Sequence, residues 1–307
     1  MGSVVISLDA ELGWGFHDLP EPPRDRVEGA RRGWETTLDV LDDHDVPATW
    51  AIVGHLMLER CDREHADHPA PRDWFQRERG EWRDRPDLRF GPDLVSAVRE
   101  SPVAHEIGSH SFSHVLFGDP DTPEVLARAE CQRARDITAD WGFSPDSFVF
   151  PRNEVGHLDA LAESGFRVYR GRTSLPEGAP RVLETIAREP SLLVDPSIDD
   201  RGLVNLPASV FCFGFEGPLR TVAETVWTDP MVALAHLGID QAAANDGVFH
   251  IWWHPNNVTT DRDERRIRRI VEYVARRRAD ADLRVETMGD VARRVLEDGP
   301  AARANAG

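Results

Sequence analysis

Three histidines lie within one short segment, His105-Glu-Ile-Gly-Ser-His110-Ser-Phe-Ser-His114. His110 and His114 are four positions apart, which predicts both imidazoles on one face of a helical turn, where they could bind one divalent metal ion. The segment is not an H-E-x-x-H motif, because Glu106 directly follows His105 and the next histidine is five positions on. Many pairs with this spacing bind nothing, which is the alternative, and we expect His105 itself to be structural.

Two carboxylates, Asp9 and Glu11, follow an apolar run near the start of the chain. On an extended segment their side chains point to the same side, so one could bind a metal while the other accepts a proton. The alternative is a cap or a turn, which is the commoner use of an isolated D-x-E pair.

Arg152 follows a third apolar run, in the segment Phe148-Val-Phe-Pro151-Arg152-Asn153. An arginine beside a carboxylate can orient it and keep it ionised. The alternative is a surface arginine after a turn-forming proline.

His254 ends a fourth apolar run, Phe249-His-Ile-Trp252-Trp-His254. On a strand, His250, Trp252 and His254 share one face, and a histidine at such a strand end is a candidate general acid. A histidine satisfied by backbone carbonyls is the alternative, for which His250 is the better candidate. Trp252 could stack on a sugar or pack in the core.

Together these groups predict metal-assisted hydrolysis. A metal ion polarises a carbonyl and activates water, a carboxylate takes the proton, and a histidine protonates the leaving group.

The elements that carry these groups alternate along the chain. Apolar, β-branched runs predict strands at residues 4–8, 48–53, 103–108, 147–150, 166–169 and 248–253. Helical periodicity predicts helices at residues 26–43, 93–100, 122–141, 157–164, 230–245, 261–278 and 289–296. This alternation predicts an α/β fold with a largely parallel sheet, closed or nearly closed into a barrel, whose active groups lie at the C-terminal ends of the strands.

We expect residues 1–298 to form one domain. Within it, residues 60–92 are rich in Arg, Asp, Glu and Pro and predict an insertion or long loop, either a lid or, as the simpler interpretation, a solvated irregular segment. The small polar tail at 299–307 is expected to be flexible.

The four segments resemble the motifs of the NodB-like polysaccharide deacetylases, a carbohydrate esterase family. The first motif is matched by Ile6-Ser-Leu-Asp9-Ala-Glu11-Leu-Gly-Trp14-Gly, and the metal-binding motif by the segment from His105 to His114. Phe150-Pro-Arg152-Asn153 and Ile251-Trp-Trp-His254-Pro-Asn-Asn resemble the third and last motifs. The sequences of the first, third and last motifs are similar to those of a subgroup of the family that is often associated with surface-glycan gene clusters.

The resemblance implies a distorted (β/α)7-type barrel, the NodB homology domain. It also implies a hydrolase of carbon–nitrogen bonds other than peptide bonds, which removes an N-acetyl group from a sugar or polysaccharide precursor and releases acetate. By similarity one divalent metal ion, zinc, would be bound by His110, His114 and one carboxylate.

The resemblance further implies that Asp9 is the base, Arg152 its tether and His254 the acid. Trp14, Asn153 and Trp252 are then expected to contact the substrate.

The first motif departs from the family pattern, which has two adjacent aspartates, because Ala10 separates Asp9 from Glu11. We assign Glu11 to the metal as the second carboxylate, although the two roles could be exchanged. An aspartate partner for His254 is not evident, and Asp195 and Asp199 are the candidates.

The charge balance excludes several partners. The chain has 307 residues, with 54 acidic and 36 basic residues, and every basic residue is arginine, so the net charge is −18. This excess of acid argues against a nucleic-acid binder and against docking on an anionic membrane. The charge balance indicates either a GC-rich genome, which favours arginine codons, or a halophilic host. In a high-salt cytosol, salt screens the repulsion between the many surface carboxylates.

Three scattered cysteines, Cys61, Cys131 and Cys212, predict a reducing compartment. The N-terminal residues lack a signal-peptide pattern, so we expect a cytoplasmic protein that acts on a smaller or carrier-linked N-acetylated sugar. Two rival hypotheses are an allantoinase-like hydrolase of a non-sugar amide on the same fold, and a non-catalytic glycan-binding barrel.

Overall fold

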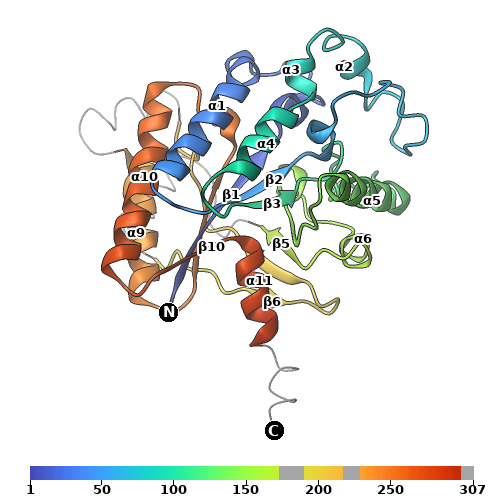
Figure 1. Ribbon diagram of the computed structural model, residues 1–307. Helices are drawn as coiled ribbons and strands as arrows, with labels where there is room; N and C mark the ends of the chain where they lie inside the picture. The colour runs from blue at the N-terminus through green and yellow to red at the C-terminus, as the bar shows by residue number, and fades with distance from the viewer. Residues whose placement is uncertain (173–189, 217–228, 299–307) are drawn as a thin grey trace.

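The computed structural model describes residues 1–172, 190–216 and 229–298, so the predicted tail at 299–307 lies outside the described residues. The described residues form one sheet of ten strands surrounded by helices (Figure 1). The strand order is β6-β7-β5-β4-β3-β2-β1-β9-β8, and β10 pairs with the first half of β1. Within these residues the edge strands β6 and β8 are not paired with each other, so the sheet is an incompletely closed barrel.

All pairings between these strands are parallel except that of β6 with β7. Parallel strands are buried on both faces, which explains why their sequences are continuous apolar runs. The strands are β1 (Ser3–Ala10), β2 (Thr49–Ile52), β3 (Glu106–Ser109), β4 (Ser147–Phe148), β5 (Val168–Gly171), β6 (Ser197–Ile198), β7 (Val204–Pro207), β8 (Val210–Phe211), β9 (Val248–Trp253) and β10 (Arg284–Glu286).

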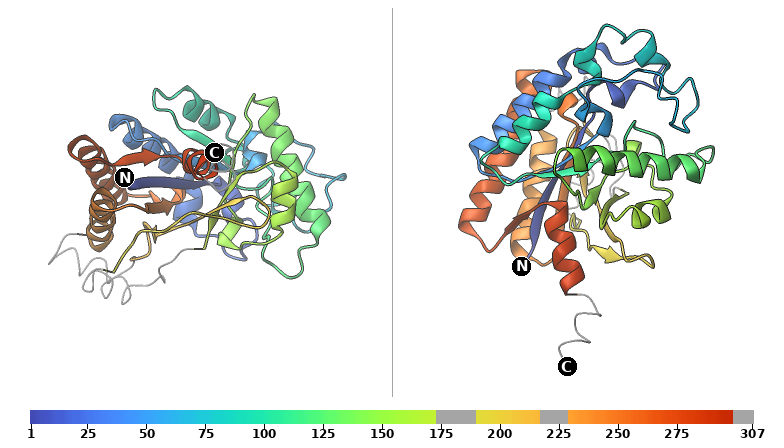
Figure 2. Two further views of the ribbon diagram at one scale, coloured as in Figure 1. Left: turned by 90° about the horizontal axis from the view of Figure 1, so that it is seen from below. Right: turned by 45° about the vertical axis from the view of Figure 1, so that its right-hand side comes forward.

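The long helices lie around the sheet, with α1, α4, α9 and α10 on one side and α5 and α6 on the other (Figures 1 and 2). Their bounds are α1 (Arg24–Asp43), α4 (Pro92–Glu100), α5 (Glu124–Asp140), α6 (Leu158–Glu163), α9 (Pro230–Ala244), α10 (Asp261–Asp280) and α11 (Met288–Glu297). No helix of the described residues is both long and apolar enough to cross a membrane.

Helix α1 shows how the apolar spacing becomes packing. Its predicted apolar positions, Val27, Ala30, Trp34, Leu38 and Leu41, are all buried. Trp34 stacks on Trp50 of β2 with 5.3 Å between ring centroids, which fixes the helix against the strand beside β1. The predicted helix is therefore confirmed together with the face that it buries.

Residues 60–92 differ from the solvated, irregular segment that the composition suggested. They contain two short helices, α2 (Gln76–Arg79) and α3 (Pro86–Arg89), and lie at the end of the barrel opposite the N-terminus (Figure 1). Phe75, Trp82 and Leu88 from this segment are buried. Trp82 and Leu88 pack with Phe16 and Val27 in one apolar cluster, and Phe75 belongs to the main core, so apolar contacts join the segment to the barrel.

Candidate active site

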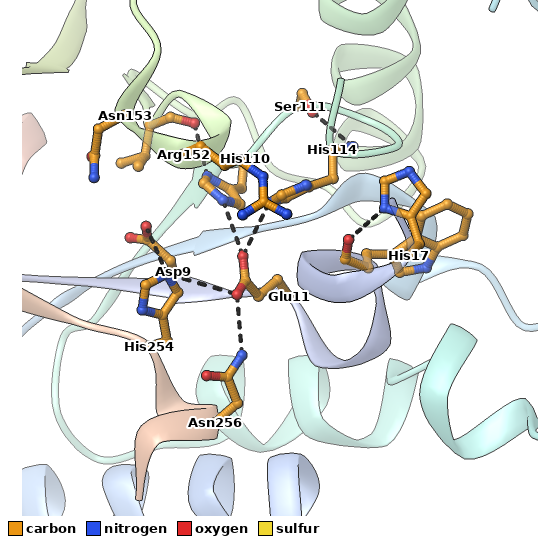
Figure 3. Close-up of polar contacts among 12 residues, drawn as sticks. Asp9, Glu11, His17, His110, Ser111, His114, Arg152, Asn153, His254 and Asn256 are labelled. Atoms are coloured by element: carbon orange, nitrogen blue, oxygen red, sulfur yellow. Dashed lines mark hydrogen bonds and ion pairs between the residues drawn. The ribbon is translucent and has the colours of Figure 1, made fainter. Parts of the chain in front are cut away.

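The C-terminal ends of three strands meet at the candidate site (Figure 3). Asp9 lies on β1, and Glu11 begins the short 3-10 helix η1 (Leu12–Phe16) directly after it. His110 follows β3, and His254 follows β9, which pairs with β1. The parallel pairing of these strands therefore brings residues from distant parts of the sequence together.

Glu11, His110 and His114 form a buried cluster. Oε2 of Glu11 lies 3.1 Å from Nε2 of His114 and 3.4 Å from Nε2 of His110. Nδ1 of His110 lies 2.8 Å from the carbonyl oxygen of Val149 and must carry the hydrogen, so the lone pair of Nε2 faces the cluster. Among the described residues this buried Nε2 has no hydrogen-bond partner, as expected of a metal ligand.

The predicted helical turn at His110–His114 is wrong. Ser111 and His114 both have positive φ angles, 61° and 63°, and the segment is an irregular loop after β3. The loop rests on the buried carboxylate of Glu130, which accepts hydrogen bonds from the backbone N–H groups of Phe112 and Ser113 at 2.9 and 2.7 Å. The two imidazoles thus converge through backbone strain supported by Glu130 rather than through helical periodicity.

Asp9 is bound by an arginine that the sequence analysis did not select. Arg170, on β5, donates two hydrogen bonds to its carboxylate, at 2.6 and 2.7 Å. Oδ1 of Asn153 accepts from the same guanidinium at 2.7 Å. Burial raises the pKa of Asp9, but Arg170 outweighs it, so that the pKa lies below its ordinary value and the carboxylate is ionised.

The predicted contact between Arg152 and Asp9 is wrong. Arg152 follows Pro151 in a left-handed conformation with φ of 53°, and its guanidinium binds Asp18 at 2.6 Å. This backbone conformation directs the side chain away from Asp9 and leaves that carboxylate to Arg170. Whether Arg152 takes part in catalysis stays a prediction.

His254 lies between the two carboxylates. Its Nε2 is 3.7 Å from Oδ2 of Asp9 and 3.7 Å from Oε1 of Glu11. Its Nδ1 lies 3.2 Å from Oδ1 of Asn257, and 24% of its side chain is exposed. Neither candidate aspartate contacts His254. Asp199 accepts hydrogen bonds from the backbone N–H groups of Arg201 and Leu203, and Asp195 is exposed. The residue that holds the His254 ring is Asn257.

Glu11 is fixed from several sides. Its Oε1 accepts from Nδ2 of Asn256 at 3.1 Å, and a Cβ on Gly15 would collide with its carboxylate. Burial raises the pKa of Glu11, but His254, His110 and His114 outweigh it and hold the pKa well below its usual range. Glu11 is therefore an ionised carboxylate beside two histidines, whereas Asp9 has both oxygens on Arg170.

The imidazole of His114 is suited to bind a metal in its neutral form. Burial lowers the pKa of His114, although the nearby Glu11 carboxylate opposes this effect. A metal ion binds only the deprotonated ring nitrogen, so the environment favours the form that coordinates.

The two histidines expected to be structural, His105 and His250, are held by hydrogen bonds away from the cluster. His105 accepts from the backbone N–H of Ala48 at 3.1 Å and lies 3.0 Å from Asp42. His250 lies 2.8 Å from Oγ of Ser7 and 3.1 Å from the carbonyl oxygen of Pro207. Both expectations are confirmed.

The tryptophans predicted to contact substrate are buried. Trp14 is 1% exposed and its indole N–H points to the carbonyl oxygen of Arg89 at 3.3 Å. Trp252 is 3% exposed, with the guanidinium of Arg170 4.2 Å from its ring centroid. These rings form the wall behind the polar groups and offer no open face for stacking, and whether they contact the substrate stays a prediction.

Four further residues near the site were missed: His17, Glu130, Arg170 and Asn256. The signal for Arg170 was present, since it directly follows the strand predicted at 166–169 and strand ends were where polar groups were sought. The ring centroid of His17 lies 6.0 Å from that of His114. Burial is the main cause that lowers the pKa of His17 to about 4. No local spacing could have connected His17 or Glu130 to His114.

The chain matches the sequence model of the family described as polysaccharide deacetylase over residues 16–163. No curated protein sequence matches it.

Several solved structures share the fold. One, from Mycobacterium smegmatis and assigned as a polysaccharide deacetylase, has a TM-score of 0.61 and 18% identity, over 99% of this chain and 91% of that one. A protein from Pseudomonas aeruginosa PAO1 with the same assignment has a TM-score of 0.59 and 14% identity, over 97% and 92% of the two chains. The PuuE allantoinase has a TM-score of 0.58 and 14% identity, over 97% and 91%. The likeness confirms the predicted distorted (β/α) barrel, and the match at residues 16–163 relates the chain to the polysaccharide deacetylases.

Proposed function

We propose that this chain is a metal-dependent deacetylase that removes the acetyl group from an N-acetylated carbohydrate and releases acetate. The observation that carries the proposal is the separation of tasks between the two carboxylates. Glu11 faces His110 and His114, while Asp9, bound by Arg170, lies beside His254.

The cluster fits a divalent metal ion. Two imidazoles and one carboxylate are a common ligand set of catalytic zinc, which keeps a further position open, so we propose that Glu11, His110 and His114 hold zinc. The buried, unpartnered Nε2 of His110 is the observation that favours an ion over a simple hydrogen-bonded cluster. When bound, such an ion supplies polarisation of the acetyl carbonyl and greater acidity of water.

Asp9 is assigned as the general base. Arg170 takes one lone pair on each carboxylate oxygen, which leaves the others free to accept the proton of an attacking water. The water oxygen forms the new bond to the acetyl carbon, and Asp9 holds the proton beside the reacting atoms. Arg170 is a positioning residue, and Asn153 fixes its guanidinium.

His254 is assigned as the general acid. Asn257 fixes the ring through Nδ1, so that Nε2 is directed to the space beside both carboxylates. A proton on Nε2 can pass to the amide nitrogen as the carbon–nitrogen bond breaks, which gives acetate and a free amino sugar. The partial exposure of His254 agrees with a group that meets the substrate from the solvent side.

Acetate release from free, nucleotide-linked and lipid-linked N-acetyl sugars tests the proposal. We expect the wild type to release acetate from at least one class, Asp9→Asn to lose this activity, and Asp39→Asn, at an exposed aspartate of α1, to retain it. Hydrolysis of allantoin without acetate release would contradict the sugar assignment. Binding of sugars without turnover, unchanged in Asp9→Asn, would contradict the enzymatic roles.

Two properties of the host environment belong to the same proposal. We propose a cytoplasmic location because the sequence has only three cysteines and they are scattered along it. The excess of acid over arginine favours activity at high salt, and the acetate assay at low and molar salt tests it.

A further inference from the structure

A second cluster of metal-ligating side chains lies outside the candidate active site. His55, Cys61, His65 and Glu78 each offer one ligand atom, and these four atoms lie within 4.8 Å of one another. His55 belongs to the 3-10 helix η2 (Gly54–Met57) that follows β2, whereas the other three residues belong to the segment 60–92. The cluster therefore joins this segment to the barrel.

Glu78 is the centre of the cluster. Its Oε2 lies 2.8 Å from Nε2 of His65, and its Oε1 lies 2.8 Å from Sγ of Cys61 and 3.3 Å from Nε2 of His55. The Glu78 side chain is 1% exposed. Arg89 donates to the same Oε1 at 3.0 Å and holds the carboxylate from behind.

His55 supplies an independent indication of a missing ligand. Nδ1 lies 3.2 Å from the carbonyl oxygen of Arg89, which can only accept, so Nδ1 carries the hydrogen. The lone pair of Nε2 then faces the carboxylate of Glu78, and this fully buried atom has no hydrogen-bond partner among the described residues. Two lone pairs facing each other in a buried site are stabilised by a positive charge between them, either a proton or a metal ion.

We propose that His55, Cys61, His65 and Glu78 form a second, structural metal site that takes zinc. Two imidazoles, one thiolate and one carboxylate are all zinc ligands and make a closed set of four, the coordination number of structural zinc, and the thiolate selects against magnesium and calcium. Zinc bonds of about 2.0 to 2.3 Å place tetrahedral ligand atoms about 3.3 to 3.8 Å apart, so the pairs at 2.8 Å must open slightly and the wider pairs, up to 4.8 Å, must close. The charges of the thiolate and the carboxylate together balance the ion.

The site also has a route by which a cation can reach it. Cys61 and His65 line a surface cavity of about 300 Å³. The same cavity is lined by the carboxylates of Asp62, Asp67, Asp136 and Asp140. These acids attract a divalent ion toward the ligands without belonging to the cluster.

The role of this metal is to fasten the segment 60–92. The regular structure of the segment is limited to two helices of four residues each, and most of its backbone hydrogen bonds join residues only three to five positions apart. Arg77 of the segment donates to the carbonyl oxygen of His17 at 3.1 Å, and Trp74 donates to that of Ser113 at 3.1 Å. Metal binding adds its free energy to the stability of the folded segment. Because Trp74 and Arg77 contact the active-site loops, a metal that fixes the segment also stabilises these loops.

Cobalt substitution tests the site without depending on catalysis. Metal-free protein is titrated with Co²⁺, and a thiolate-to-cobalt charge-transfer band is sought in the near ultraviolet. Cys61 is the only cysteine in either cluster, so we expect the band in the wild type and in His110→Ala, and its loss in Cys61→Ser. Cys131→Ala, which removes a buried thiol in α5, is the matched control and should keep the band. A wild type that binds Co²⁺ without this band overturns the proposal.

Protection from trypsin gives a second measurement, useful if Cys61→Ser does not fold. The segment contains many arginines, so trypsin reports on its opening. In His110→Ala, zinc at ten times its dissociation constant should slow cleavage within residues 60–92 about tenfold, because the metal binds only the closed form. His65→Ala should show no such slowing. Cleavage of the segment at the same rate with and without zinc would overturn the assignment.

Discussion

The pairing of Arg170 with Asp9 gives the sharpest prediction on stability. The two side chains are 0% and 2% exposed and are joined by hydrogen bonds of 2.6 and 2.7 Å. Arg170→Met removes one partner and leaves a buried carboxylate without its cation. Breaking a buried ion pair in this way costs about 3 to 5 kcal/mol, or a factor of roughly 100 to 4,000 in the ratio of folded to unfolded protein.

The effect of pH has a definite sign. In the wild type the pKa of Asp9 is lowered on folding, so its contribution to stability is complete above the unfolded pKa and is lost as the pH falls through the folded pKa. In Arg170→Met, burial dominates and raises the folded pKa above the unfolded one. The variant then loses stability as the pH rises, so its deficit relative to the wild type should grow between pH 4 and pH 7.

Urea unfolding of metal-free protein between pH 4 and pH 7 measures this deficit. The double variant Asp9→Asn/Arg170→Met removes both charges, and we expect it to be more stable than the sum of the single variants predicts by about 1 to 3 kcal/mol. Single effects that add within about 0.5 kcal/mol, or a deficit that does not change with pH, would refute the reasoning.

Three further predictions concern the surroundings of the cluster. Gly15→Ala should displace the Glu11 carboxylate and lower zinc affinity measurably by titration calorimetry while the circular dichroism stays native, and unchanged affinity would contradict the packing. Glu130→Gln keeps the shape but removes the charge under the His114 loop. We expect weaker metal binding and a free energy of unfolding in urea that is lower by about 1 to 3 kcal/mol. A free energy of unfolding equal to that of the wild type would contradict the supporting role of Glu130. Arg152→Ala should leave the coupling energy between Asp9 and Arg170 in the double-variant cycle unchanged, because its guanidinium binds Asp18 and not Asp9, and an altered coupling energy would restore it as a tether.

The sequence was sufficient to predict what depends on strand ends. Asp9, Glu11, His110 and His254 each follow an apolar run, and in a parallel barrel the ends of neighbouring strands meet. Their convergence could therefore be predicted without knowing a single distance. The helix at Arg24–Asp43 was likewise predictable, because its buried face repeats every three or four residues.

What the sequence could not provide was the direction of individual side chains. Arg152 has the expected position after β4, but its left-handed backbone directs it to Asp18, and Arg170 from the next strand binds Asp9 instead. Trp14 and Trp252 have the residue type of a sugar platform, yet both rings are covered. Such outcomes depend on φ angles and on packing with residues far away in the sequence.

The segment 60–92 shows a second limit. Its composition is typical of a solvated loop. Among so many charged residues, nothing in the sequence indicates that Glu78 is buried beside two histidines and a cysteine. The spacing of these ligands follows no short motif, because His55 comes from the barrel and the others from the insertion. Only the folded arrangement brings them together.

Zinc content and acetate release, measured on the same samples, test the central claim most directly. Wild type and His110→Ala are loaded with zinc, freed of excess ion and analysed for metal by mass spectrometry and for acetate release from the best N-acetyl sugar. We predict that His110→Ala contains one zinc equivalent fewer per chain than the wild type and releases no acetate, whether or not a second zinc is present elsewhere. A His110→Ala protein with undiminished zinc and undiminished acetate release would contradict the assignment of Glu11, His110 and His114 as the catalytic metal site.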